Sequence, residues 1–256
     1  MANVRGIRFV EIVCVDVEAS ARWYTQLLGL TPIDGAPPGA RWLDAGHAAL
    51  KLTGATAATR GSGWDANNLQ RGIRHVGFKV ADVDAHATRL KEAGVVFKID
   101  PKDATGAVRI TFFDDLDGNR LELVEGALEY HRTWSPELAE RERVTLPGPE
   151  DPPRFDHAAI TVADIDESLR FYRDVLDFEV IGQLTMDDPR GFLITYLKGG
   201  AGGVELFSWG EATLDNPAAS GDDRLGFGAI GVGIEGGVAS SVVEPDGVLL
   251  EVVDVG

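Results

Sequence analysis

The sequence predicts an α+β fold made of tandem βαβββ modules, and a repeated strand is the first observation that leads to it. Residues 74–82 recur as residues 156–164, and each copy is a short alternating strand that starts next to a histidine. Two further copies begin at Phe9 and Phe227, with phenylalanine in place of the histidine. We therefore expect four related modules in one chain.

The second observation is a repeated spacing between a histidine and a glutamate. Glu122 follows His75 by 47 residues, and Glu205 follows His157 by 48 residues. Both glutamates alternate with apolar neighbours, as residues of a strand do. An imidazole and a carboxylate on separate strands of one sheet make half of a nitrogen and oxygen metal site, and the chain contains two such halves.

Period-2 alternation separates two faces in each histidine strand. One face carries Val76, Phe78 and Val80 in the first copy, and Ala158, Ile160 and Val162 in the second. The histidines fall on the opposite, less apolar face. Two residues further on, this face carries Gly77 or Ala159, which are small and are expected to leave room for a ligand above the imidazole.

The first half of the chain contains two modules, in residues 1–125. In the first, Asp16 is predicted to cap a helix over 17–28 that ends at Gly29, with strands around 41–44 and 48–52 to follow. The second has its helix through 90–93 with Gly94 as the stop, then strands near 95–99, 108–113 and 121–124. Asp117-Gly118 before the last strand is typical of a hairpin turn.

The second half contains the other two modules, in residues 153–256, after a linker over 126–152. The third module is predicted to have its helix over 166–176 and strands over 178–183, 192–197 and 204–207. In the fourth, Glu251 follows Phe227 by only 24 residues, and the glycine-rich middle cannot hold a helix. We expect it to be truncated. Ser135-Pro136 predicts a short helix within the linker.

Composition restricts the class of protein. The 256 residues carry a net charge of −17, which disfavours binding to nucleic acid or to anionic membranes. No apolar run is long enough for a membrane span or a signal peptide, so we expect a cytoplasmic protein, monomeric or homodimeric, whose partner is a small-molecule substrate. Cys14 is the single cysteine and is expected to be a packed thiol.

Four segments together resemble the vicinal oxygen chelate superfamily, which includes glyoxalase I, bleomycin-resistance proteins and extradiol dioxygenases. They are residues 75–82, 115–122, 157–172 and 244–251. In that superfamily, paired modules curl into a cup-shaped half-barrel, with ligands on the first and last strand of each module. The resemblance therefore implies two cups.

Module pairing decides which residues meet. If modules two and three pair across the linker, in the exchanged arrangement of fused glyoxalase I chains, one cup collects His75, Glu122, His157 and Glu205. The other cup then holds Phe9, Lys51, Phe227 and Glu251, and should bind no metal. If neighbouring modules pair, neither cup has a complete ligand set. We expect the exchanged pairing, with Lys51 and Glu251 forming an ion pair.

A lone histidine or glutamate on a strand is usually structural, but two pairs at matched spacing favour metal ligands. His47, His86 and His131 fall in a turn, a helix and the linker, and are expected on the surface.

The resemblance and the ligand set together predict an enzyme that uses one divalent ion per chain: nickel, zinc, manganese, cobalt or iron. A substrate with two vicinal oxygens would chelate the ion, and Glu122 or Glu205 would carry a proton next to its carbonyl in an isomerase, epimerase or lyase reaction. No organic cofactor site is indicated. Two alternatives remain: an extradiol-type ring-cleaving dioxygenase, and a metal-free small-molecule binding or resistance protein.

Overall fold

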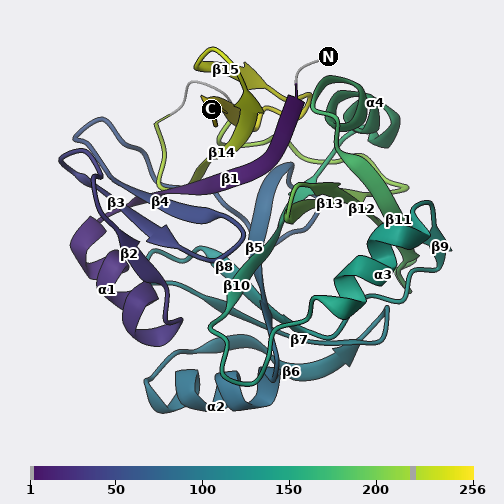
Figure 1. Ribbon diagram of the computed structural model, residues 1–256, viewed down its shortest axis with the longest axis horizontal. Coiled ribbons are helices and arrows are strands. Elements are labelled where there is room, and N and C mark those ends of the chain that lie inside the picture. The colour runs from purple at the N-terminus through teal and green to yellow at the C-terminus, as the bar shows by residue number, and fades with distance from the viewer. Residues whose placement is uncertain (1–2, 220–222) are drawn as a thin grey trace.

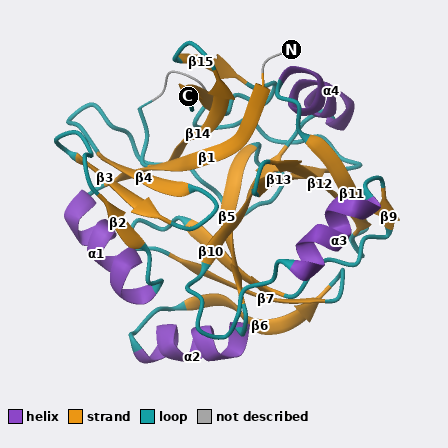
Figure 2. Cartoon of the chain, in the orientation of Figure 1, coloured by secondary structure: helices purple, strands orange, loops and turns teal. Residues whose placement is uncertain are grey.

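Two β-sheets lie side by side, with the helices at their outer edges (Figures 1 and 2). The computed structural model describes residues 3–219 and 223–256; residues 1–2, where the first predicted domain begins, and 220–222 lie outside the described residues. Among the described residues, no helix combines the length and the hydrophobicity needed to cross a lipid bilayer. The arrangement confirms the predicted α+β class with two half-barrel sheets.

The elements follow the modular order predicted from the sequence. Module one has β1 (Asn3–Cys14), α1 (Val17–Leu27), β2 (Thr31–Ile33), β3 (Ala40–Asp44) and β4 (Ala49–Gly54). Module two has β5 (Gly72–Val80), α2 (Val83–Glu92), β6 (Phe97–Ala104), β7 (Val108–Asp114) and β8 (Arg120–Glu125). The linker carries β9 (Arg132–Thr133) and α3 (Pro136–Val144).

Module three has β10 (Arg154–Thr161), α4 (Ile165–Arg170), one π-helical turn (Phe171–Val175), β11 (Glu179–Thr185), β12 (Leu193–Gly199) and β13 (Gly202–Ser208). Module four has β14 (Gly226–Glu235), β15 (Ser240–Val243) and β16 (Leu249–Asp254), and no helix among its described residues, as predicted. The single helix predicted over 166–176 is thus divided, and the wider π-helical turn keeps both Tyr172 and Leu176 buried.

Strand pairing exchanges the modules between the sheets. The nine-stranded sheet runs β6-β7-β8-β5-β10-β13-β12-β11-β9, so that modules two and three meet where β5 pairs antiparallel with β10. The seven-stranded sheet runs β15-β16-β14-β1-β4-β3-β2, and modules one and four meet where β1 pairs with β14. The predicted exchanged pairing is confirmed.

Aspartates begin three of the helices. The side chains of Asp16 and Asp82 each accept a hydrogen bond from the backbone N–H group three residues later, and that of Asp164 accepts from the N–H groups of Asp166 and Glu167. Cys14 is fully buried, as expected of a packed thiol, and burial raises its pKa to about 12.

The turns before β8 and β16 connect modules that are neighbours in sequence but belong to different sheets. Tyr24 on α1 donates to Asp115 Oδ2 at 2.6 Å, and Asp117 accepts from the backbone N–H of Val15 at 3.4 Å. In the other half, Asp246 accepts from the backbone N–H of Ala163 at 2.9 Å. The Asp-Gly turns thus hold the two sheets together.

A buried carboxyl in the second of these turns makes stability depend on pH. Burial raises the pKa of Glu244 to about 7, and its Oε2 and the hydroxyl of Tyr172 are both buried without a hydrogen-bond partner. Because the folded state binds this proton more tightly than the unfolded chain, the free energy of unfolding falls as pH rises from about 4.5 to about 7, by about 3 kcal/mol.

Glu244→Gln is therefore expected to unfold at higher denaturant concentration than the wild type above pH 7, and at the same concentration near pH 4.5. Chemical denaturation across this pH range measures the difference. Glu129→Gln, at an exposed position in the linker, is the matched control and should follow the wild type throughout. If the denaturation midpoints of Glu244→Gln and the wild type changed with pH in the same way, Glu244 would be ruled out as a source of the pH dependence.

Candidate metal centre

Strand register brings the four predicted ligands to one face of the nine-stranded sheet. Gly77 on β5 lies opposite His157 on β10 and also opposite Glu122 on β8. Ala159 on β10 lies opposite His75 on β5 and Glu205 on β13. Residues opposite one another in paired strands project to the same side, so both histidines and both glutamates face the interior of the cup.

Three donor atoms form a nearly equilateral triangle. His75 Nε2 lies 3.1 Å from His157 Nε2, and Glu122 Oε2 lies 3.2 Å from each of these nitrogens. An octahedral ion with bonds of about 2.1 Å places adjacent ligand atoms about 3.0 Å apart. The triangle therefore matches one face of such a coordination sphere.

Glu205 stands apart from this triangle. One ligand atom from each of the four residues lies within 4.8 Å of the others, but Glu205 Oε1 lies 3.5 Å from Nδ1 of His157, and not beside the Nε2 atom of the triangle. All four side chains are buried. Within residues 3–219 and 223–256, these four residues form the group that could hold a metal ion. Two imidazoles and two carboxylates are a donor set that suits a divalent transition metal.

The proton affinities of the two glutamates differ in the metal-free chain. Burial raises the pKa of Glu205 to about 8, with further increases from the charges of Glu122 and Asp156. Burial also acts to raise the pKa of Glu122, but hydrogen bonds with both imidazoles outweigh it and lower this pKa to about 2. Burial lowers the pKa of His75.

A neighbouring aspartate orients His157. Asp156 Oδ2 lies 3.0 Å from His157 Nδ1 and 3.6 Å from Lys79 Nζ. Although burial opposes ionisation, the charges of Lys79 and His157 lower the pKa of Asp156. A carboxylate on Nδ1 sets the tautomer that leaves Nε2 available to a metal.

Asp156 was not predicted as a site residue, because strict alternation places it on the face opposite His157. The register shifts between Phe155 and His157, and this bulge brings both neighbours toward the cup. A second shift on the same strand pair brings Arg74 beside His75. The signal was present in the sequence, since a charged residue precedes each of the two histidines within an otherwise apolar strand.

The small residue Gly77 does not make room for a ligand as predicted, because the imidazole of His157 fills that space. A Cβ atom at position 77 would lie 2.2 Å from Cε1 of His157. The glycine is therefore required by the close approach of the histidine on the paired strand.

Gly77→Ala is expected to displace the His157 ring and to weaken metal affinity by roughly 10- to 100-fold, as changes next to a ligand do. Competition with a metal-chelating dye measures the affinity. Gly231→Ala is a matched control, since its Cβ would lie 2.1 Å from the ring of Phe9 in the other sheet. It should lower stability and leave the metal affinity unchanged, whereas equal metal affinities for the two variants would contradict the assignment.

A cavity of about 300 Å³ opens above the four ligands and has mostly apolar walls. His75, Glu122 and Glu205 line it together with Asp156. Its apolar lining consists of Ile99, Val108, Ile110, Phe112, Val124, Leu128, Leu184, Met186, Phe192, Ile194 and Phe207. The cavity is therefore suited to a ligand with an apolar body and a polar end at the ligands.

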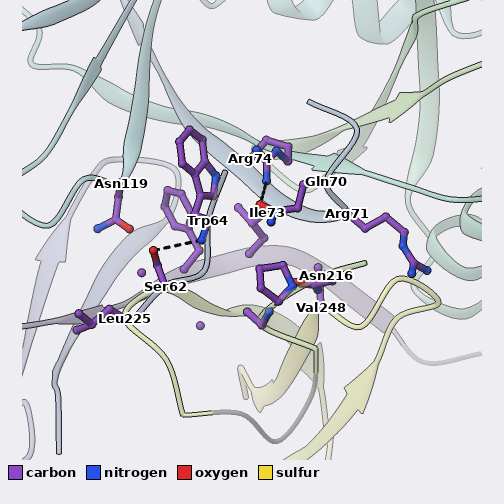
Figure 3. A pocket seen from close by; sticks show the side chains of 15 residues that line it. Ser62, Trp64, Gln70, Arg71, Ile73, Arg74, Asn119, Asn216, Leu225 and Val248 are labelled. Carbon is purple, nitrogen blue, oxygen red and sulfur yellow. Dashed lines mark hydrogen bonds between the residues drawn. The ribbon is translucent and has the colours of Figure 1, made fainter. Parts of the chain in front are cut away.

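Basic side chains stacked on a tryptophan border the cavity. The guanidinium groups of Arg74 and Arg120 lie 4.9 and 5.2 Å from the ring of Trp64. Figure 3 shows Arg74 pointing to Gln70, to which it donates a hydrogen bond of 3.0 Å, beside a further cavity of about 40 Å³. Lys102 lines the larger cavity as well.

Among the residues that the structure describes, the second sheet contains no comparable ligand set, and an ammonium group occupies its centre. Lys51 Nζ lies 3.0 Å from Glu251 and 3.2 Å from Glu11, and 5.1 Å from the ring centre of Phe9. The expected ion pair between Lys51 and Glu251 is thus present. The prediction for one position was wrong: strand register shows that Ala229, and not Phe227, occupies the place in the second sheet that corresponds to His75 in the first.

The reason for this correction is a shifted register in β14. Phe9 lies opposite Gly231 as His157 lies opposite Gly77, so the residue two places before Gly231 is the counterpart of His75. Phe227 instead pairs with Ile12. Because β14 is rich in glycine, its sequence shows no clear alternation from which the bulge could be located.

The other three histidines are not members of the group of possible metal ligands found among the described residues. His131 is exposed and His47 is partly buried. His86 was expected on the surface, and this was wrong, because it shares the inner face of α2 with Val83 and Leu90 and is 8% exposed. Burial, followed by the charge of Arg89, lowers the pKa of His86 to about 4.

Comparisons with known proteins agree with this architecture. The family model described as the Glyoxalase/Bleomycin resistance protein/Dioxygenase superfamily matches residues 6–123 and 154–227. The crystal structure of glyoxalase I from Zea mays superimposes with a TM-score of 0.71 over 99% of this chain and 93% of that one, at 17% identity, a similarity of fold alone.

Two relatives were found by sequence. An iron-dependent extradiol dioxygenase from Rhodococcus jostii (strain RHA1) is 28% identical over 185 residues, which are 70% of this chain. The chain spans only 56% of the length of that relative. The protein YurT from Bacillus subtilis (strain 168) is 29% identical over 119 residues, covering 43% of this chain and 91% of YurT.

Proposed function

Because the chain belongs to the Glyoxalase/Bleomycin resistance protein/Dioxygenase superfamily, we propose that it is a divalent-metal enzyme that moves a proton next to a carbonyl. The substrate would bind the ion through two vicinal oxygens, and the reaction would be an isomerisation, an epimerisation or a lyase reaction. The observation that carries the proposal is the meeting of two histidines and two glutamates, three of which line a cavity.

The residues present fit a divalent ion. Two neutral imidazoles and two carboxylates balance its charge, and three of the donor atoms already have the spacing of adjacent ligands. His75, His157, Glu122 and Glu205 would hold it. When bound, such an ion would polarise the substrate carbonyl and stabilise the negative charge left by the departing proton.

Glu205 is the better placed of the two glutamates to carry the proton. Both glutamates line the cavity, but Glu122 contacts both imidazoles, whereas Glu205 lies outside the donor triangle. Its carboxylate can therefore face a substrate while the other three residues keep their places. A positioned base of this kind typically contributes on the order of 10²–10⁴-fold to the rate.

The cavity walls limit the substrate class. Aliphatic and aromatic side chains surround the space above the ligands, so a 2-oxo or 2-hydroxyketo compound with an apolar body fits better than a sugar or a cyclitol. The hydroxyl groups of a polyol would lose their hydrogen bonds to water against these walls.

The experiment is solvent exchange in deuterated water. The protein, loaded in turn with nickel, zinc, manganese, cobalt or iron, is incubated with small 2-oxo and 2-hydroxyketo compounds, and loss of the proton signal next to the carbonyl is followed by NMR. Exchange that needs both protein and metal is the expected result. Its absence with every metal, for substrates that bind, would count against proton transfer.

Extradiol dioxygenase activity is the second candidate, and the donor triangle favours it. Two histidines and one carboxylate on one face of an ion form the ligand set of many iron(II) oxygenases, and His75, His157 and Glu122 have this arrangement. The Rhodococcus relative is such a dioxygenase. Oxygen consumption by the iron-loaded protein with a catechol, without solvent exchange, would establish this activity instead.

A further inference from the structure

Another cavity, distinct from the two described above and of about 160 Å³, lies between the linker helix α3, the turn between β3 and β4, and the strands β5, β10 and β12. Its lining is rich in basic groups, although the chain as a whole has 24 Lys and Arg against 41 Asp and Glu. The basic side chains are His47, Lys79, Arg141, Arg154 and Lys198, and the acidic ones are Glu142 and Asp156.

Internal ion pairs account for the two acidic groups. Lys198 Nζ lies 3.2 Å from Glu142 Oε1, and Lys79 Nζ lies 3.6 Å from Asp156 Oδ2. The positive charges of Arg141 and Arg154 are then not balanced by an acidic side chain of the lining. Since anions concentrate where cations are in excess and water is partly excluded, the cavity attracts negative charge.

Two nitrogen atoms at this cavity are buried without a hydrogen-bond partner, Nδ1 of His47 and Nε of Arg154. A terminal nitrogen of Arg154 donates to the backbone oxygen of Thr145, which holds the guanidinium in place. The guanidinium Nε of Arg154 can only donate, and buried donors are rarely left unpaired in proteins. An oxyanion in the cavity would supply the acceptor for Arg154.

The size and shape of the lining limit the ligand. The volume is several times that needed by one water molecule. The apolar part of the lining consists of Gly126, Ala127, Leu138, Leu146, Gly200 and Ala201, and contains no aromatic ring to stack on a base or a flavin. The space therefore suits a compact ligand with several acceptor oxygens.

We propose that this cavity is a binding site for a phosphate group, with the guanidinium groups of Arg154 and Arg141 as donors and His47 beside them in the lining. Tetrahedral oxyanions match guanidinium groups in geometry as well as in charge. The proposal is independent of the reaction at the metal centre. The two sites are neighbours nevertheless, since Asp156 lines both cavities and also contacts His157.

Calorimetric titration of the purified protein with inorganic phosphate tests the proposal. We expect saturable binding of one phosphate per chain, weakened by at least about tenfold in Arg154→Gln, because a charge-assisted hydrogen bond contributes about 1.5–3 kcal/mol. Arg141→Gln should weaken binding in the same direction, and its exposed position makes it safe for folding. Arg143→Gln is the control: it lies on the same helix, pairs with Glu140 and does not line the cavity.

Parallel titrations with glycerol phosphate and with acetate separate the possible sources. Tighter binding of glycerol phosphate than of inorganic phosphate would identify a phosphate monoester as the ligand, and equal binding would identify free phosphate. Acetate that binds as tightly as phosphate would overturn the proposed class. Phosphate binding that is absent, or that is unchanged in both Arg154→Gln and Arg141→Gln, would overturn the site itself.

Discussion

Replacing Glu205 with glutamine is expected to slow metal-dependent solvent exchange by roughly 10²- to 10⁴-fold, because glutamine cannot accept the proton. Glutamine has nearly the same shape as glutamate, and the three donors of the triangle remain in place. The variant should therefore still bind a metal ion. NMR exchange rates and metal content, measured on the same preparation, separate loss of the base from loss of the ion.

Glu251→Gln provides the matched control for this experiment. Glu251 occupies in the second sheet the position that Glu122 occupies in the first, and it contacts Lys51 instead of a histidine. Its exchange rate should equal that of the wild type. Glu122→Gln, in contrast, is expected to lose exchange and metal together, since Glu122 contacts both imidazoles. Wild-type exchange in Glu205→Gln would remove this residue from the proposed mechanism.

The purified chain is expected to carry about one divalent ion, and His157→Ala is expected to carry almost none. Nε2 of His157 is one corner of the donor triangle, and Lys51 occupies the equivalent centre in the second sheet. Elemental analysis after dialysis measures the content. Because an ion that binds only the folded state stabilises it by about 4 kcal/mol at 1,000 times its Kd, chelation should also lower the thermal midpoint of the wild type but not that of His157→Ala.

His131→Ala controls for the loss of a histidine as such, since His131 is exposed in the linker and accepts a hydrogen bond from the backbone N–H of Thr185. This variant should keep its ion and respond to chelation as the wild type does. Two ions per wild-type chain, or an ion retained by His157→Ala, would be incompatible with a single centre at the four ligands. A wild type without metal under every loading condition would favour the metal-free binding protein.

The modular plan and the four residues that meet in the cup could be predicted from the sequence. Alternation and helix caps locate most elements because they act over a few residues, and local pattern is what a sequence displays directly. The matched spacings from His75 to Glu122 and from His157 to Glu205 identified the residues that share a face. The exchange of modules followed from the ligand inventory, since only that pairing gathers both histidines.

Tertiary structure alone decided the details that depend on how strands meet. The bulges beside Phe155 and Ala159 turn Asp156 and Arg74 toward the cup, against the alternation on which the sequence prediction relied. Gly77 is required because of His157, which is 80 positions away in the chain. His86 is buried because it lies on the face of α2 that packs against the rest of the protein. The basic cavity gathers side chains from three modules and the linker. Such contacts between distant residues leave no local pattern in the sequence, because they depend on strand register, on bulges and on the packing of one sheet against the other.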